Sequence, residues 1–152
     1  AYDYQNGQYI QQTGVWQNKY RGSFDAGLRY YTDDYPIYRY ADLLLMLAEA
    51  KAIMGENPAT EINLVRQRAF GTSYQASVHG YPNQPIDSNI NEALLKERLY
   101  EFLVEGRRWY DLRRFGAEYV TKYTFASASK LLWPVDLGTL TDNPALQQTP
   151  GY

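Results

Sequence analysis

The chain has 152 residues, no cysteine, and 15 lysines and arginines against 17 aspartates and glutamates, for a net charge of −2. This balance excludes a general attraction for nucleic-acid phosphates, and the lack of cysteine excludes disulfide bonds and thiolate metal sites. No apolar run approaches the ~20 residues that a membrane-spanning helix needs, and the start at Ala1 without methionine indicates a mature or truncated chain.

Residues 1–36 are rich in Tyr, Gln, Gly and Asp without sustained periodicity, which predicts extended segments and loops. Trp16 lies among several tyrosines in this irregular region. Flat rings can stack on the C–H faces of sugars, so Trp16 is a candidate ligand-binding residue. The alternative is that these rings only pack the loops onto the helices.

The region 37–115 is predicted to be helical. Apolar residues keep helical spacing over 38–54, Gly55 is a stop signal, and Asn57-Pro58 provides an N-cap for a second helix over 58–70. The two helices must turn back on each other as a hairpin like those of tetratricopeptide (TPR) repeats. The residues expected in their interface are Leu44, Leu45, Ala48, Ile62, Val65 and Ala69.

Residues 72–88 form a long loop, and long ordered loops are often functional. Its rings make Tyr74, His79 and Tyr81 candidate ligand contacts. A third helix is predicted from about Asn89, with Glu92 as its capping-box partner. A short helix over 108–115 follows, and 116–152 is interpreted as mostly coil. The predicted fold class is mainly α, with TPR-like helical hairpins and long irregular loops, in a single domain or fragment.

The stretch 105–116 (EGRRWYDLRRFG) concentrates four arginines among aromatic residues. Opposite charges recur three and four residues apart, a spacing that brings them together on a helix. We therefore interpret this stretch as internal ion pairs rather than as a nucleic-acid surface, with a phosphate or carboxylate site as the alternative. The members of this structural ion-pair motif are Glu105, Arg107, Arg108, Asp111 and Arg114.

The sequence does not indicate catalysis. Asp33-Asp34 could serve a glycosidase but lies in a polar stretch, where a solvated turn is expected. His79 is the only histidine and, without cysteine, predicts neither a metal cluster nor a catalytic triad. We expect no enzyme activity, no cofactor and no metal.

Several spaced motifs together resemble the SusD/RagB family of outer-membrane nutrient-binding lipoproteins, over about residues 19–152. The similar segments are 36–44 (PIYRYADLL), 62–69 (INLVRQRA), 105–114 (EGRRWYDLRR) and 143–152 (NPALQQTPGY). Three positions depart from the family pattern: Arg107 stands where His is frequent, Asp136 where a second Pro is usual, and Thr149 where the family has Asn. The length matches only the C-terminal part of such a protein, and the lipidated N-terminal cysteine is absent.

The resemblance implies capture of glycans or other nutrients at the bacterial cell surface, and delivery to a TonB-dependent (SusC-like) outer-membrane transporter. It implies an N-terminal lipid anchor and helices that face the transporter. An alternative is a helical-repeat interaction module that contacts the transporter and binds no ligand of its own. A glycosidase is a third hypothesis.

Overall fold

The computed structural model describes residues 2–5, 8–12 and 19–152 of the chain. The chain divides into two compact units, residues 1–39 and 40–152. Trp16 lies outside the described residues, so its role as a ligand contact stays a prediction.

The first unit contains two antiparallel β-hairpins, although residues 1–36 were expected to be irregular. Strand β1 (Tyr2–Gln5) pairs with β2 (Gln8–Gln12), and β3 (Ser23–Asp25) pairs with β4 (Leu28–Tyr30). The β3–β4 turn places Ala26 and Gly27 at φ values of 47° and 80°. Positive φ at both central residues matches the twist of a two-residue hairpin, which explains the glycine.

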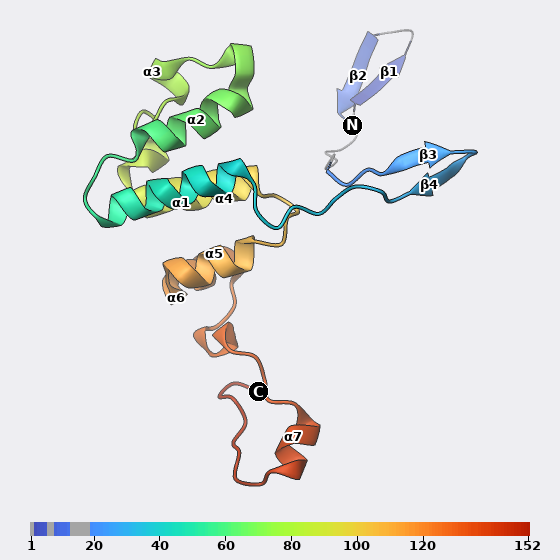
Figure 1. Ribbon diagram of the computed structural model, residues 1–152, viewed down its shortest axis with the longest axis vertical. Coiled ribbons are helices and arrows are strands. Elements are labelled where there is room, and N and C mark those ends of the chain that lie inside the picture. The colour runs from blue at the N-terminus through green and yellow to red at the C-terminus, as the bar shows by residue number, and fades with distance from the viewer. Residues whose placement is uncertain (1, 6–7, 13–18) are drawn as a thin grey trace. The chain divides into compact units, whose positions relative to one another are not determined.

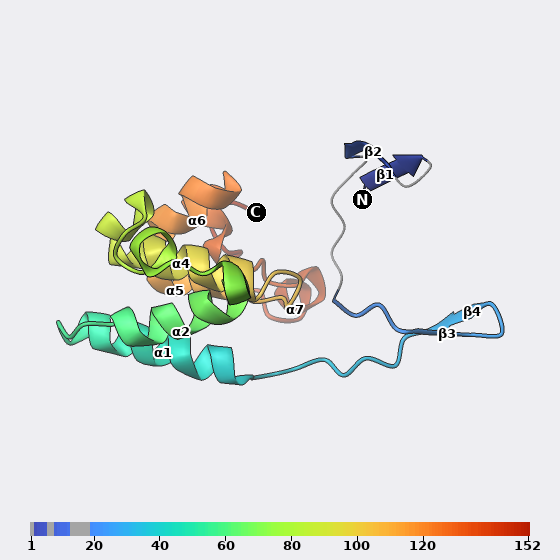
Figure 2. The same cartoon turned by 90° about the horizontal axis from the view of Figure 1, so that it is seen from above.

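The second unit is built on three packed helices, α1 (Tyr40–Ile53), α2 (Ala59–Phe70) and α4 (Ile90–Glu101). Figures 1 and 2 show α1 running along α4, with α2 turning back from the end of α1. The predicted hairpin of 38–54 and 58–70 is therefore confirmed to within two residues at each end. The mainly α fold class is confirmed as well.

Local signals explain the turn between α1 and α2. The N–H of Glu56 donates to the carbonyl of Lys51 at 2.8 Å, and the N–H of Gly55 donates to that of Ala52 at 3.2 Å. This pair of bonds is a Schellman motif, and Gly55 supplies the positive φ of 75° that it requires. The side chain of Asn57 then accepts from the N–H of Ala59 at 3.0 Å and so opens α2.

Two apolar clusters form the core. The first joins α1, α2 and α4 through Leu45, Ala48, Ile62, Val65, Leu94 and Phe102. Four of the interface residues expected from the sequence belong to it, and Leu44 is half-buried against it. The expectation for Ala69 is wrong, because this residue is exposed at the end of α2. The second cluster contains Leu95, Leu112 and Val120.

The remaining helices are short. The predicted helix over 108–115 is α5 (Arg108–Phe115), and α6 (Ala117–Thr124) packs against it. The tail adds a 3-10 turn at Ala128–Leu131 and α7 (Leu137–Asp142). The interpretation of 116–152 as mostly coil therefore misses two helices, α6 and α7. No helix in the described part of the chain is long and apolar enough to cross a bilayer.

The connection from α2 to α4 is ordered by short elements. It holds 3-10 turns at Gly71–Ser73 and Pro85–Ser88 on either side of α3 (Ala76–His79). Asn89 caps α4 as expected, by accepting from the N–H groups of Asn91 and Glu92 at 3.0 and 3.2 Å. The side chain of Glu92 does not complete a capping box. It accepts instead from Lys122 at 2.6 Å and from the hydroxyl of Tyr123, both on α6.

Candidate functional site

The three candidate residues of the α2–α4 connection lie close together and are all half-buried. The ring of His79 stacks on Phe70 with 4.0 Å between centroids and lies tilted beside Tyr74 at 6.1 Å. Its Nδ1 atom accepts a hydrogen bond from the backbone N–H of Gln75 at 2.9 Å. The ring of His79 therefore packs in an aromatic cluster, and the short helix α3, which ends at His79, holds it there.

Tyr81 is held against α2. Its backbone N–H donates to Oδ1 of Asn63 at 2.7 Å, and its ring centroid lies 6.0 Å from the guanidinium of Arg66. Burial, together with the nearby carboxylate of Asp87, raises the pKa of Tyr81. Tyr81, like the carbonyl of His79, is thus held by side chains of α2.

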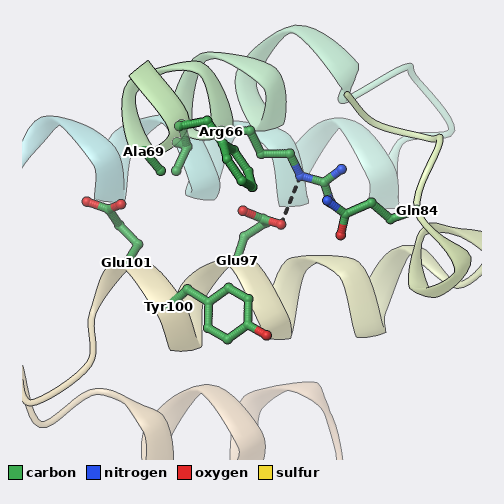
Figure 3. A pocket seen from close by; sticks show the side chains of 8 residues that line it. Arg66, Ala69, Gln84, Glu97, Tyr100 and Glu101 are labelled. Carbon is green, nitrogen blue, oxygen red and sulfur yellow. Dashed lines mark hydrogen bonds and ion pairs between the residues drawn. The ribbon is translucent and has the colours of Figure 1, made fainter. Parts of the chain in front are cut away.

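Arg66 is the anchor of this connection, with 1% of its surface exposed. It donates to both carboxylate oxygens of Asp87, at 2.7 and 2.9 Å, and to the carbonyl of His79 at 3.0 Å. Its Nε donates to Oε1 of Glu97 on α4 at 2.9 Å, the bond drawn in Figure 3. A guanidinium can serve all these acceptors at once because its five N–H groups point in fixed directions. Arg66 therefore ties the connection to two helices.

Burial and neighbouring charges shift the pKa values of Arg66 and Glu97 in this network. Burial alone would lower the pKa of Arg66, but hydrogen bonds and charge from Asp87 and Glu97 raise it overall. The pKa of Glu97 is raised, because the cost of burying its charge outweighs the attraction of Arg66. Arg66 therefore keeps its charge, while the carboxyl group of Glu97 gives up its proton at a higher pH than a solvated glutamate does.

A pocket of about 160 Å³ opens beside this network, between α2 and α4. Its lining combines aliphatic and aromatic side chains with an amide, a guanidinium and two carboxylates, and Figure 3 shows the carboxylates of Glu97 and Glu101 directed toward α2. The lining residues are Val65, Arg66, Ala69, Phe70, Gln84, Glu97, Tyr100 and Glu101.

The arginine motif forms a second charged network, in which Asp111 is 4% exposed. Asp111 pairs with Arg114 at 3.2 Å, one of the contacts expected from the spacing. Its shorter contact, 2.8 Å, is to Nε of Arg98 on α4. Arg107 reaches Asp42 on α1 at 3.3 Å. Burial raises the pKa of Asp111 in spite of the surrounding guanidinium groups. These pairs link α5 to α1 and α4.

The remaining members of the motif have different surroundings. Arg108 donates to the carbonyl of Leu95 at 2.7 Å and lies 4.9 Å from the ring centroid of Tyr123. Arg114 also pairs with Glu49 of α1, and Glu105 is buried, with 4% of its surface exposed. Arg108 therefore binds backbone and ring rather than a carboxylate, which the three-residue spacing from Glu105 did not predict.

Sequence reasoning missed the partners that come from other helices. Arg66 lies four residues after the buried Ile62, and Asp42 lies three before the buried Leu45, so both are on core-facing sides of their helices. A charged residue at such a position must find a buried partner, and this signal could have identified both. No group of His, Cys, Asp and Glu suited to a metal ion occurs among the residues that the structure describes.

Comparison with known proteins relates both sequence and fold to one family. A profile of the SusD family matches residues 1–128. SusD-like protein P38 of Formosa agariphila is 32% identical over 122 residues, which are 76% of this chain and 24% of that protein. The starch-binding protein SusD of Bacteroides thetaiotaomicron is 29% identical over 150 residues, which are 90% of this chain and 25% of that protein.

Solved structures of SusD superfamily proteins also resemble this chain in fold. B. fragilis NanU superposes with a TM-score of 0.82 at 49% identity, over 99% of this chain and 34% of that one. A SusD superfamily protein from Bacteroides vulgatus gives 0.78 at 48% identity, over 88% of this chain and 32% of that one. The chain thus spans about a quarter of these curated relatives and about a third of these structures. Because the profile covers most of its residues and its fold matches family structures, the chain belongs to the SusD family.

Proposed function

We propose that this chain is the C-terminal portion of a cell-surface protein that captures oligosaccharides or other nutrients and delivers them to a TonB-dependent outer-membrane transporter. The observation that carries the proposal is the match, over 90% of the chain, to a relative named for binding starch. The protein acts by binding and release, without a chemical step. It is held at the outer membrane by a lipid anchor in a part of the protein outside these 152 residues.

The α2–α4 connection supports this role. Tyr74, His79 and Tyr81 are half-buried, so each combines a supported position with a surface that a ligand can reach. Sugar recognition needs rings that are held in place, because ordering them on binding would reduce the affinity. Arg66 supplies the rigidity through its bonds to Asp87 and to the carbonyl of His79. We propose these rings, with Trp16, as the ligand contacts within this chain.

The test is a titration of soluble oligosaccharides, followed by tryptophan fluorescence and calorimetry, on the full-length protein and on the 152-residue chain. The variants are Trp16→Ala and Tyr74→Ala. The matched control is Tyr110→Ala on α5, because this ring is 69% exposed and lies outside the connection. The proposal expects the full-length protein to bind at least one glycan, and Trp16→Ala or Tyr74→Ala to weaken binding. Equal affinity in all variants would move the contacts out of this chain, and a full-length protein that binds no nutrient would refute the function.

A second candidate function is a helical module that only contacts the transporter, and α1 favours it. Leu43, Met46 and Leu47 share a side of this helix and are 58%, 41% and 48% exposed, while Leu45 on another side is buried in the core. Exposed apolar side chains beside a buried apolar side are typical of a helix that a further partner covers. Leu47→Lys should then weaken capture of the protein by its transporter without changing glycan binding. The reverse result would favour the binding role alone.

A further inference from the structure

The pocket between α2 and α4 is lined by two buried charged side chains, Arg66 and Glu97, and by two exposed rings. Phe70 and Tyr100 are 41% and 65% exposed, and one face of Phe70 is covered by His79. Arg66 and Glu97 lie deeper, at 1% and 7% exposed. Figure 3 shows the carboxylate of Glu97 between the two helices, with one oxygen directed at Arg66.

The charges beside this pocket do not balance. Arg66 carries one positive charge and faces two carboxylates, because Asp87 takes two of its hydrogen bonds and Glu97 takes one. Among the residues that the structure describes, Oε1 of Glu97 accepts from Arg66, while Oε2 accepts no hydrogen bond and keeps some contact with solvent. The second oxygen is therefore open to the pocket that Glu97 lines, and the local excess of negative charge favours a donor that brings positive charge.

The other cations nearby are on the rim and already engaged. Lys96 donates to Oε1 of Gln84 at 3.1 Å, and its Nζ lies 5.6 Å from the ring centroid of Tyr100. Arg68 pairs with Glu101, and its own side chain is 66% exposed. Neither bonds to Glu97, which leaves the second oxygen of that carboxylate for a group that enters from outside.

We propose that this pocket binds a cationic group, a primary ammonium or a guanidinium, which donates to Oε2 of Glu97 while the rings of Phe70 and Tyr100 face its charge. Cations are attracted to aromatic faces, and a charged hydrogen bond to a buried carboxylate is stronger than a neutral one. The volume of about 160 Å³ suits one side-chain-sized group, since pockets for larger ligands reach ~300–1,000 Å³. The site adjoins the glycan contacts proposed above, since Phe70 stacks on His79, but the cation is recognised by Glu97, which is not one of those contacts.

The test follows backbone amide shifts of the isotope-labelled 152-residue chain by NMR. The probes are n-propylammonium, methylguanidinium and the neutral n-propanol. We expect saturable shifts in α2 and α4 with both cations, and at least about tenfold weaker binding of the alcohol, because it brings no charge. Glucosamine and Nα-acetyl-lysine amide then present the ammonium group on a sugar and on a protein side chain. The compound that binds more tightly shows whether the natural ligand of the pocket is an amino sugar or a protein side chain.

Two variants and one control complete the experiment. Glu97→Gln keeps the shape but removes the charge, and should weaken cation binding about tenfold or more. Tyr100→Leu alters an exposed ring without disturbing the core and should weaken binding about two- to fivefold. The control is Glu92→Gln, which removes a carboxylate of the same helix that pairs with Lys122 instead. Propanol that binds as tightly as the cations, or cation affinity that is unchanged in both Glu97→Gln and Tyr100→Leu, would overturn the proposal.

Discussion

Replacing Arg66 by alanine tests whether one buried guanidinium holds the α2–α4 connection in place. The substitution removes four hydrogen bonds, three to the carboxylates of Asp87 and Glu97 and one to the carbonyl of His79. It leaves two carboxylates that are only 4% and 7% exposed without their main positive partner. The folded chain must then keep unpaired buried charge, take up protons or release the connection.

The expected loss in the free energy of unfolding can be calculated from the second outcome, in which the carboxylates take up protons. Protonating a carboxylate at pH 7 costs about 3.7 kcal/mol for Glu and about 4.2 kcal/mol for Asp, at ~1.36 kcal/mol for each unit between pH and the ordinary pKa. This range agrees with the ~3–5 kcal/mol lost when one partner of a buried pair is removed. The unpaired carbonyl of His79 adds about 1 kcal/mol. We therefore expect Arg66→Ala to lower the free energy of unfolding by about 5 kcal/mol at pH 7.

The assay is urea unfolding followed by far-ultraviolet circular dichroism, with Gln67→Ala as the matched control. Gln67 lies on the same helix and is exposed, so we expect a change of no more than about 0.5 kcal/mol. Hydrogen exchange of amides 71–88 would detect local release of the connection. Equal losses in the two variants, with protection of these amides unchanged, would refute the role of Arg66.

Three further predictions concern the core and the two charged networks. Leu45→Ala should cost ~2–5 kcal/mol in urea unfolding, because Leu45 is fully buried in the first apolar cluster; an unchanged midpoint would contradict this. Asp111→Ala should cost ~3–5 kcal/mol because it leaves the buried Arg98 without its nearest partner, and the loss should persist at high salt; a small loss that salt removes would indicate a surface pair. Burial makes the pKa of Glu97 higher in the folded chain than in the unfolded chain. Its contribution to stability is therefore complete below the pKa of the unfolded chain and is lost as the pH rises through the pKa of the folded chain. Glu97→Gln should therefore gain stability relative to the wild type between about pH 4 and 7, and a difference that stays constant or moves the other way would contradict the assignment.

The helices were predictable where three local signals agreed. Over 38–70, the apolar spacing, Gly55 and Asn57 all indicated a hairpin, and each of them acts within a few residues along the chain. The β3–β4 hairpin of the first unit was missed, because Phe24, Leu28 and Tyr30 are all exposed and show no alternation of buried and exposed positions. Helix α6 was missed because Gly116 was interpreted as the start of a coil, whereas the burial of Val120 against α5 makes a short helix stable.

The same limit of local signals applies to the ion pairs of the candidate site. Spacing along one helix correctly predicted the contact between Asp111 and Arg114, because three residues bring side chains together whatever surrounds them. The shorter contact of Asp111, to Arg98, joins two helices and has no counterpart in the spacing.

The sequence by itself determined the family resemblance, the α1–α2 hairpin and the residue types that could bind a ligand, since these depend on local order along the chain. Only the tertiary structure decided which charges meet between helices. Arg66 and Glu97 are 31 residues apart and share a hydrogen bond because α2 and α4 pack side by side. The surplus carboxylate oxygen and the pocket beside it follow from that packing. Burial sets the cost of an unpaired charge, and burial is a property of the assembled helices rather than of any one of them.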